Sequence, residues 1–279
     1  FVWTYTLMYN QTTTNMAMDE AQVWFVDQST GTETLIGMVM NNDEVTVTVD
    51  QNLCASIGDF VWEDINQNGI QDTGEPGIED VTVNLLDGNG NQIGTTTTAS
   101  DGYYEFTDLT PGNYIVEFVT PTGFNPSPSN QGGDDTVDSD ADESTGRTGV
   151  ITLANGDNDP TNDAGFIKDS NISHEKSFVS STPNVDGTFT VVYSITVNND
   201  GGQGQYDLTD NPGYDDDIMI NSASYVSDAP GNAANTLAGT GPWTLADDQF
   251  IGAYSTHIYT LTVNVSISIT DGQGDDDYT

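Results

Sequence analysis

Residues 57–75 read Ile57-Gly-Asp-Phe-Val-Trp-Glu-Asp-Ile-Asn-Gln-Asn-Gly-Ile-Gln-Asp-Thr-Gly-Glu75. The second part, from Asp64 to Glu75, meets every fixed position of the calcium-loop pattern D-x-(D/N)-x-(D/N)-G-x5-E. The first part carries a strand pattern, and Pro76-Gly77 followed by Val81-Thr-Val83 leads into another strand. A helical calcium sensor has helices on both sides of its loop, so these flanks favour a rigid cross-link between strand ends over a switch.

Six groups of this loop are predicted to bind calcium, a hard cation that takes oxygen ligands. They are the side chains of Asp64, Asn66 and Asn68, the carbonyl of Ile70, and the side chains of Asp72 and Glu75. Glu75 occupies the position that binds through both carboxylate oxygens, and Gly69 stands where the loop turns sharply.

Period-2 alternation of apolar and polar residues recurs along the whole chain and predicts strands that each bury one face. Examples are 45–49, 81–85, 114–118, 191–197 and 259–269. Clusters of Asp, Asn, Gly and Pro separate them, as turns between strands require. The predicted fold class is all-β, with tandem immunoglobulin-like or Greek-key β-sandwich domains that carry calcium-binding loops.

Breaks in composition near Asn52 and again near Lys168 divide the chain into three predicted parts. Residues 54–168 form a calcium-binding β-sandwich, and residues 169–279 form an immunoglobulin-like β-sandwich. Residues 1–53 are too few for an ordinary sandwich but contain four plausible strands. Two interpretations stay open for them: the end of a domain whose beginning is absent, or strands completed by a neighbouring subunit through β-augmentation.

The charge balance is extreme, with 44 acidic residues against 3 basic ones and a formal net charge of −41. Such a surface repels nucleic acid and anionic lipid, so neither is an expected partner. No apolar run is long enough to cross a membrane, and membrane insertion is not expected. The chain has two His, one Cys and no motif of a hydrolase or phosphate site, so it is not predicted to be an enzyme.

Three further stretches extend the motif and carry a family resemblance. They are Glu75-Pro-Gly-Ile-Glu-Asp-Val-Thr-Val-Asn-Leu-Leu86, Asp101-Gly-Tyr-Tyr-Glu-Phe106 and Leu109-Thr-Pro-Gly-Asn-Tyr-Ile-Val-Glu-Phe118. Together with residues 57–75 they resemble the SdrD B-like domain, a calcium-binding repeat of bacterial surface adhesins, over about residues 55–168. The resemblance implies a Greek-key sandwich related to the collagen-adhesin B-type fold, which serves as a stalk segment and holds about three calcium ions.

The resemblance also assigns further calcium ligands to a second acidic stretch, residues 134–143. They are Asp134, Asp135, Asp138, Asp140 and Asp142. Asp157 and Asp159, with Asn158 and Asp163 beside them, are candidates to complete these sites. The alternative interpretation of both stretches is a solvated acidic loop. Collagen-adhesin relatives often carry a Lys to Asn isopeptide bond, but residues 55–167 contain no Lys, so that cross-link is excluded there.

The part after Ile172 resembles the DUF11-type repeat of large bacterial surface proteins, on motifs such as Asp186-Gly-Thr-Phe-Thr-Val-Val-Tyr-Ser-Ile-Thr-Val197 and Tyr206-Asp-Leu-Thr-Asp210. Both resemblances imply an extracellular location at the bacterial cell surface. The leading hypothesis is a structural, calcium-rigidified stalk or filament module whose partners are neighbouring domains of one long chain or identical subunits in a fibre. The alternative is an adhesin module that binds a host protein or polysaccharide through aromatic residues such as Trp3, Trp24 and Trp243, although these are more readily explained as core.

Overall fold

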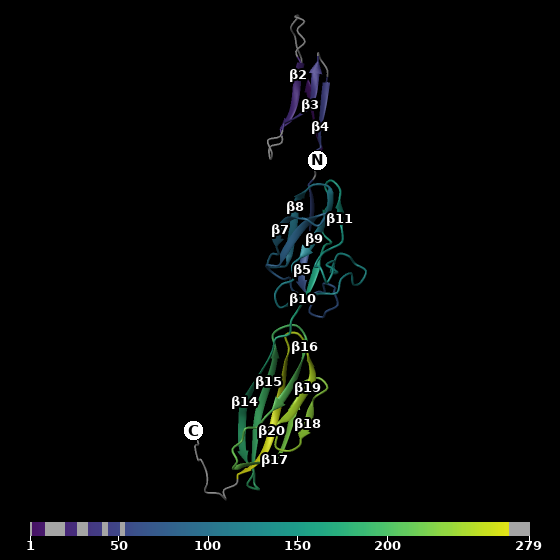
Figure 1. Cartoon of the computed structure of the whole chain (residues 1–279). Coiled ribbons are helices and arrows are strands. Elements are labelled where there is room, and N and C mark those ends of the chain that lie inside the picture. The colour runs from purple at the N-terminus through teal and green to yellow at the C-terminus, as the bar shows by residue number, and fades with distance from the viewer. Residues whose placement is uncertain (1, 9–19, 27–32, 41–43, 51–53, 268–279) are drawn as a thin grey trace.

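The computed structural model describes the backbone of residues 2–8, 20–26, 33–40, 44–50 and 54–267, and the side chains of residues 54–267. Across these ranges the regular secondary structure consists of twenty β-strands and no helix (Figure 1). The all-β fold class predicted from the alternating sequence is therefore confirmed. Within the described residues there is correspondingly no helix long and apolar enough to span a membrane.

Residues 2–50 contribute four strands in two separate pairs. Strand β1 (Val2–Met8) pairs antiparallel with β4 (Glu44–Asp50), and β2 (Glu20–Val26) pairs antiparallel with β3 (Glu33–Met40). Four strands are the number that the sequence predicts for this part of the chain. The β-augmentation suggested for this part stays a prediction.

Residues 55–168 form two sheets that face each other. The first has the order β10-β13-β5-β12, with β8 pairing to β5, and the second has the order β11-β9-β6-β7. The strands of the first sheet are β5 (Ala55–Glu63), β8 (Tyr103–Leu109), β10 (Phe124–Pro126), β12 (Asn158–Asp159) and β13 (Ala164–Lys168). Those of the second are β6 (Thr82–Asp87), β7 (Gln92–Thr97), β9 (Gly112–Phe118) and β11 (Ile151–Leu153).

The core between these two sheets follows from the period of 2 along each strand. On β9 the side chains of Tyr114, Val116 and Phe118 are buried while the residues between them are more exposed. Tyr104 of the opposite sheet packs edge-on against Phe118, with ring centroids 5.5 Å apart. Ring contacts of this geometry add stability beyond the area that they bury.

Strand β5 runs through the middle of the first sheet and has partners of both directions. It pairs antiparallel with β8 and parallel with β12 and β13. Its parallel partners are separated from it by about 100 residues of sequence, as in the register pair Asp159 with Ile57. The first and last strands of this part of the chain are thereby hydrogen-bonded to each other, and the loops at their ends come together.

Residues 172–267 form a second sandwich with its own core. A five-stranded sheet in the order β14-β15-β20-β17-β18 packs against the pair β16-β19. The strands are β14 (Ile172–Pro183), β15 (Phe189–Asn199), β16 (Gly204–Asp210), β17 (Ile218–Ser227), β18 (Ala234–Leu237), β19 (Trp243–Ile251) and β20 (Thr256–Ile267). Trp243 is a core residue here, as predicted, whereas Trp3 and Trp24 lie outside the described side chains. Figure 1 shows the two sandwiches end to end, joined after β13.

Candidate metal centre

The loop of residues 64–75 begins directly at the end of β5 and is organised around the buried carboxylate of Asp64. Its Oδ1 accepts a hydrogen bond from the backbone N–H of Asn68 at 3.1 Å, and its Oδ2 accepts one from the N–H of Gly69 at 2.8 Å. The hydroxyl of Ser127 donates to the same Oδ2 at 2.5 Å. These donors fix the loop around its first predicted ligand.

Gly69 is required by the tight turn of this loop. Its φ is +75°, a backbone conformation that side chains other than glycine rarely adopt. A Cβ atom at this position would also lie 2.2 Å from the carbonyl oxygen of Pro128. The loop is therefore packed closely against residues 127–128, which explains why the pattern has a glycine here.

The polar side chains of the loop converge on one another. The Nδ2 atoms of Asn66 and Asn68 donate to Oδ2 of Asp72 at 2.7 Å and 2.8 Å. These bonds, from Asn66 first and then from Asn68, hold the pKa of Asp72 below its usual range. Because hydrogen bonds from both amides favour the charged form of Asp72, the loop keeps an ionised carboxylate, one of the predicted ligands, beside two amide groups.

Glu75 turns its carboxylate back over the same loop. Its Oε1 accepts from the N–H of Ile65 at 2.8 Å, and its Oε2 accepts from the N–H of Asp72 at 3.0 Å. Burial raises the pKa of Glu75 despite these hydrogen bonds. Both oxygens therefore face into the loop, as a ligand that binds calcium through two oxygens must.

The backbone ties this loop to the second acidic stretch. Ile70 forms an antiparallel bridge with Asp138, flanked by hydrogen bonds from Gln71 N–H to the Val137 carbonyl and from Ser139 N–H to the Gly69 carbonyl. The carboxylate oxygens of Asp135, Asp138 and Asp140 lie within 4.8 Å of one another. Two segments that the sequence assigned to separate calcium sites are thus held side by side.

Further along, a partly buried acidic cluster lies near the buried side chain of Tyr104. Its members are Asp59, Asp140, Asp159 and Asp163, and the charge of each one raises the pKa of Tyr104 in addition to the larger effect of burial. Asp163 is fully buried, and its Oδ1 accepts from the N–H of Phe60 at 3.0 Å. Asp140 is linked to it, because Oδ2 of Asp140 accepts from the N–H of Asp163 at 2.7 Å.

The electrostatics of the Tyr104 cluster favour a bound cation. Burial, followed by the charges of Asp59, Asp140 and Asp138, raises the pKa of Asp163 to about 9. Burial is also the main cause that raises the pKa of Asp140 to about 7 and that of Asp59 to about 6. The two ion pairs found among the described residues, Arg147 with Glu117 and Lys176 with Asp210, involve none of these carboxylates.

Two buried carboxylate oxygens in this region, Asp138 Oδ1 and Asp163 Oδ2, accept no hydrogen bond from protein atoms. Buried oxygens without a donor cost free energy unless a cation or proton satisfies them. Several carboxylates with oxygens close together are the donor set that calcium takes. The residues present therefore fit calcium at the loop and at Asp135, Asp138 and Asp140, and the orphaned oxygen of Asp163 marks a further position that a cation would satisfy.

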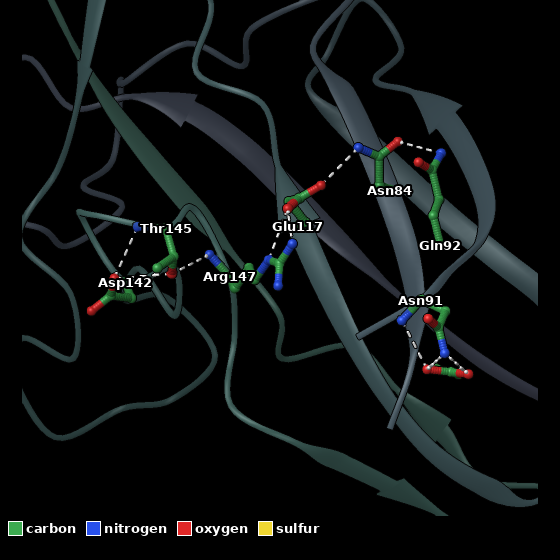
Figure 2. Close-up of polar contacts among 8 residues, drawn as sticks. Asn84, Asn91, Gln92, Glu117, Asp142, Thr145 and Arg147 are labelled. Atoms are coloured by element: carbon green, nitrogen blue, oxygen red, sulfur yellow. Dashed lines mark hydrogen bonds and ion pairs between the residues drawn. The ribbon is translucent and has the colours of Figure 1, made fainter. Parts of the chain in front are cut away.

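Not every predicted ligand joins these groups. Oδ1 of Asp142 accepts from Ser144 and Thr145 within its own turn, as Figure 2 shows for Thr145. Asp134 binds Thr136 in the same manner, with its Oδ1 2.7 Å from the threonine hydroxyl. Asp157 accepts from the N–H of Ala154 at 2.7 Å. These three exposed side chains thus stabilise local turns by accepting hydrogen bonds from residues close in sequence. Their assignment as calcium ligands stays a prediction.

Asp59 was missed by the sequence analysis, and Asp163 was considered only as a companion of Asp159. One signal points to Asp59: it shares the phase of Ile57 and Val61 on β5, so an acidic residue occupies an inward position of a strand. Its companions come from 81 to 104 positions later in the chain. The parallel pairing of β5 with β12 and β13 brings Asp159 and Asp163 to it.

The central sandwich, which holds the site, is similar to known proteins. Residues 55–166 match the family model of the SdrD B-like domain. The chain is 42% identical over 163 residues to the serine-aspartate repeat-containing protein F of Staphylococcus epidermidis, a match that covers 57% of the chain and 9% of that protein. It is 41% identical over 172 residues to the serine-aspartate repeat-containing protein D of Staphylococcus aureus, covering 55% of the chain and 13% of that protein.

Similar solved structures include the major pilin subunit BcpA of Bacillus cereus, with a TM-score of 0.35 and 11% identity, covering 77% of this chain and 59% of that one. The major pilin SpaD of Corynebacterium diphtheriae matches with a TM-score of 0.27 and 12% identity, covering 78% and 58%. Likeness at this level supports no inference about function. The chain spans about a tenth of the length of the curated relatives that it matches. Residues 55–166 carry an SdrD B-like domain, as the sequence motifs predicted.

Proposed function

We propose that the chain is a structural, calcium-rigidified module of a stalk or filament in a large bacterial surface protein, located outside the cell. The observation that carries the proposal is the pair of acidic groups that join distant segments of an SdrD B-like domain without a protein cation between them. About three calcium ions would supply the missing charge. They would fix loops that otherwise repel each other.

The residues that would hold calcium fall into two sets. The loop set consists of Asp64, Asn66, Asn68, Ile70, Asp72 and Glu75. The second set draws on Asp135, Asp138 and Asp140, which lie together, and on Asp59, Asp159 and Asp163 around Tyr104. Calcium loops of extracellular modules are often weak, with dissociation constants of about 0.1 to 1 mM, which suits a medium rich in calcium.

The expected gain in stability is large enough to matter. If free calcium exceeds the dissociation constant ten- to a hundred-fold, each ion adds about 1.4 to 2.7 kcal/mol to the free energy of unfolding. Three ions then contribute an amount comparable with the net stability of an ordinary small domain. Charge repulsion within a chain of net charge −41 destabilises the folded state, so the chain depends more strongly on this contribution from calcium.

The test is thermal unfolding of the chain in excess EDTA and in excess calcium, together with calorimetric titration of calcium into the chelator-treated protein. We expect a large fall of the melting temperature in EDTA and binding of about three ions. Asp59→Asn should weaken binding, whereas Asp80→Asn, which removes the same charge from an exposed turn, should not. An unchanged melting temperature in EDTA would refute the proposal that bound calcium stabilises the module.

The partners proposed for the module are neighbouring domains of one long chain or identical subunits in a fibre, and the part after Ile172 is proposed to be a DUF11-like repeat. A role in binding a host protein or polysaccharide loses one of its supports, because Trp243 is only 3% exposed. Electron microscopy of the intact parent protein distinguishes a stalk within one chain from a polymer of subunits.

A further inference from the structure

The segment between the two sandwiches, residues 169–171, is hydrogen-bonded on both sides. The N–H of Asp169 donates to the Gly123 carbonyl of the central sandwich at 2.8 Å. The carbonyl of Asp169 in turn accepts from the N–H of Gly202 in the C-terminal sandwich at 3.0 Å. The Nδ2 of Asn125 also donates to the Asp169 carboxylate at 2.7 Å. A segment bonded to both neighbours is not a free linker.

A buried asparagine holds the C-terminal side of this segment. Asn199 is 1% exposed, and its Oδ1 accepts from the N–H groups of Asn171 and Gly201, both at 3.1 Å. Its Nδ2 donates to the carbonyls of Gly202 and Gly252 at 2.7 Å and 2.9 Å. One side chain thus joins the connecting segment to two loops at the end of the C-terminal sandwich.

The approach between these backbones is close enough to require glycine. A Cβ atom at Gly202 would lie 1.9 Å from the carbonyl oxygen of Lys168, well inside van der Waals contact. A side chain at this position would therefore push the end of β13 away from the C-terminal sandwich.

Tyr254, in the loop between β19 and β20, spans the junction. Its hydroxyl donates to Oε1 of Glu63 at 2.5 Å and accepts from Nζ of Lys168 at 3.0 Å. Nζ of Lys168 also lies 5.0 Å from the centroid of the tyrosine ring, within the range of a cation–π contact. The N–H of Tyr254 donates to the Gly201 carbonyl at 3.1 Å, so its own loop is fixed to the loop that contacts the connecting segment.

The backbone of Tyr254 is held in an unusual conformation. Its φ is +50°, a region that costs free energy for a residue other than glycine. The neighbouring contacts outweigh that cost and aim the ring across the junction at Glu63 and Lys168, which end β5 and β13.

We propose that Tyr254 acts as a latch that fixes the C-terminal sandwich on the central one, so that the two move as one rigid body. The latch contacts are made by protein atoms alone, and the proposal therefore does not depend on bound calcium. The hydroxyl lies between a carboxylate and an ammonium group, so it makes charge-assisted hydrogen bonds to the ends of two strands of the central sandwich, β5 and β13.

The test is a distance distribution between two spin labels, measured by pulsed electron paramagnetic resonance on the full chain in excess calcium. Labels are placed at Thr97→Cys and Ser222→Cys, two exposed strand positions in the two sandwiches, with Cys54 replaced by Ser. The parent should give one narrow distribution. Tyr254→Phe, which removes only the hydroxyl, should raise the ratio of unlatched to latched molecules on the order of tenfold and broaden the distribution.

The matched control is Tyr103→Phe, which removes the hydroxyl of an exposed tyrosine on the surface of the central sandwich and should leave the distance distribution unchanged. Gly202→Ala should shift the mean distance, because its Cβ displaces the end of β13. The latch is overturned if Tyr254→Phe keeps the parent width, or if the parent already shows the broad distribution of a flexible linker. Neither result affects the proposal that bound calcium stabilises the central sandwich, which is tested by unfolding in EDTA.

Discussion

The buried acidic cluster predicts an unusual dependence of stability on pH. Between pH 4 and pH 9, Asp163 binds more protons in the folded chain than in the unfolded one, because burial raises its pKa from 3.8 to about 9. Without calcium, the free energy of unfolding therefore falls as pH rises through this window. Asp140 and Asp59, with pKa values raised to about 7 and about 6, add to the fall at its lower end.

The size of this effect follows from the slope of about 1.4 kcal/mol per pH unit for each group that differs by one proton. Between pH 5 and pH 7, Asp163 alone lowers the free energy of unfolding in EDTA by about 2.7 kcal/mol. For a domain of about 100 residues this corresponds to a melting temperature lower by roughly 10 °C or more. In excess calcium the free energy of unfolding should instead rise with pH, because calcium binds the ionised carboxylates and is displaced by protons as pH falls.

The assay is circular dichroism melting of the intact chain at pH 5 and pH 7, each in EDTA and in excess calcium. Asp163→Asn keeps the shape of the side chain and removes its titration, so its melting temperature in EDTA should change much less with pH. Asp80→Asn removes the same charge from an exposed position and should retain the full pH dependence. A parent chain in EDTA that melts at the same or a higher temperature at pH 7 than at pH 5 refutes the reasoning.

Three further substitutions test other parts of the structure. Asp64→Asn should lower the number of calcium ions bound in calorimetry by one, since it weakens the first ligand of the loop. Lys176→Met leaves the buried carboxylate of Asp210 without its 2.6 Å partner and should destabilise the C-terminal sandwich by about 1–3 kcal/mol. The added change Asp210→Leu should largely recover this loss in denaturant unfolding. Arg147→Gln should cost less than about 1 kcal/mol in the same assay, because its ion pair with Glu117 (Figure 2) is partly exposed to solvent, and a larger loss contradicts this.

The strands and the turn of residues 64–75 were predictable because their signals are local. The period-2 alternation determines which residues of β6 and β9 face inward, and the spacing from Asp64 to Glu75 places the predicted ligands within one short loop. No knowledge of distant segments is needed for either. The resemblance to the SdrD B-like domain extended the prediction to Asp138 and Asp140.

Contacts that depend on pairing between distant strands were not predictable in the same way. Asp59 meets Asp159 and Asp163 because β5 pairs in parallel with β12 and β13, and nothing in the local sequence around Asp59 indicates that register. The latch has the same origin, since Tyr254 and Glu63 are 191 positions apart. A single sequence contains all the residues of such sites but does not show which of them the fold brings together.

The topology gives the calcium sites a mechanical meaning in the proposed stalk. The chain enters the central sandwich at the start of β5 and leaves it at the end of β13, and these two strands are parallel neighbours. Tension along the chain therefore pulls the two strands past each other, so the hydrogen bonds between them share the force instead of breaking one at a time.

Asp59 on β5 and Asp163 before β13 place carboxylates across this same interface. A cation bound between them resists the same sliding motion, whereas two bare carboxylates repel each other and favour it. Calcium is thus proposed to supply a cross-link at the interface that carries the pulling force, in a domain whose residues 55–167 contain no lysine to form a covalent one.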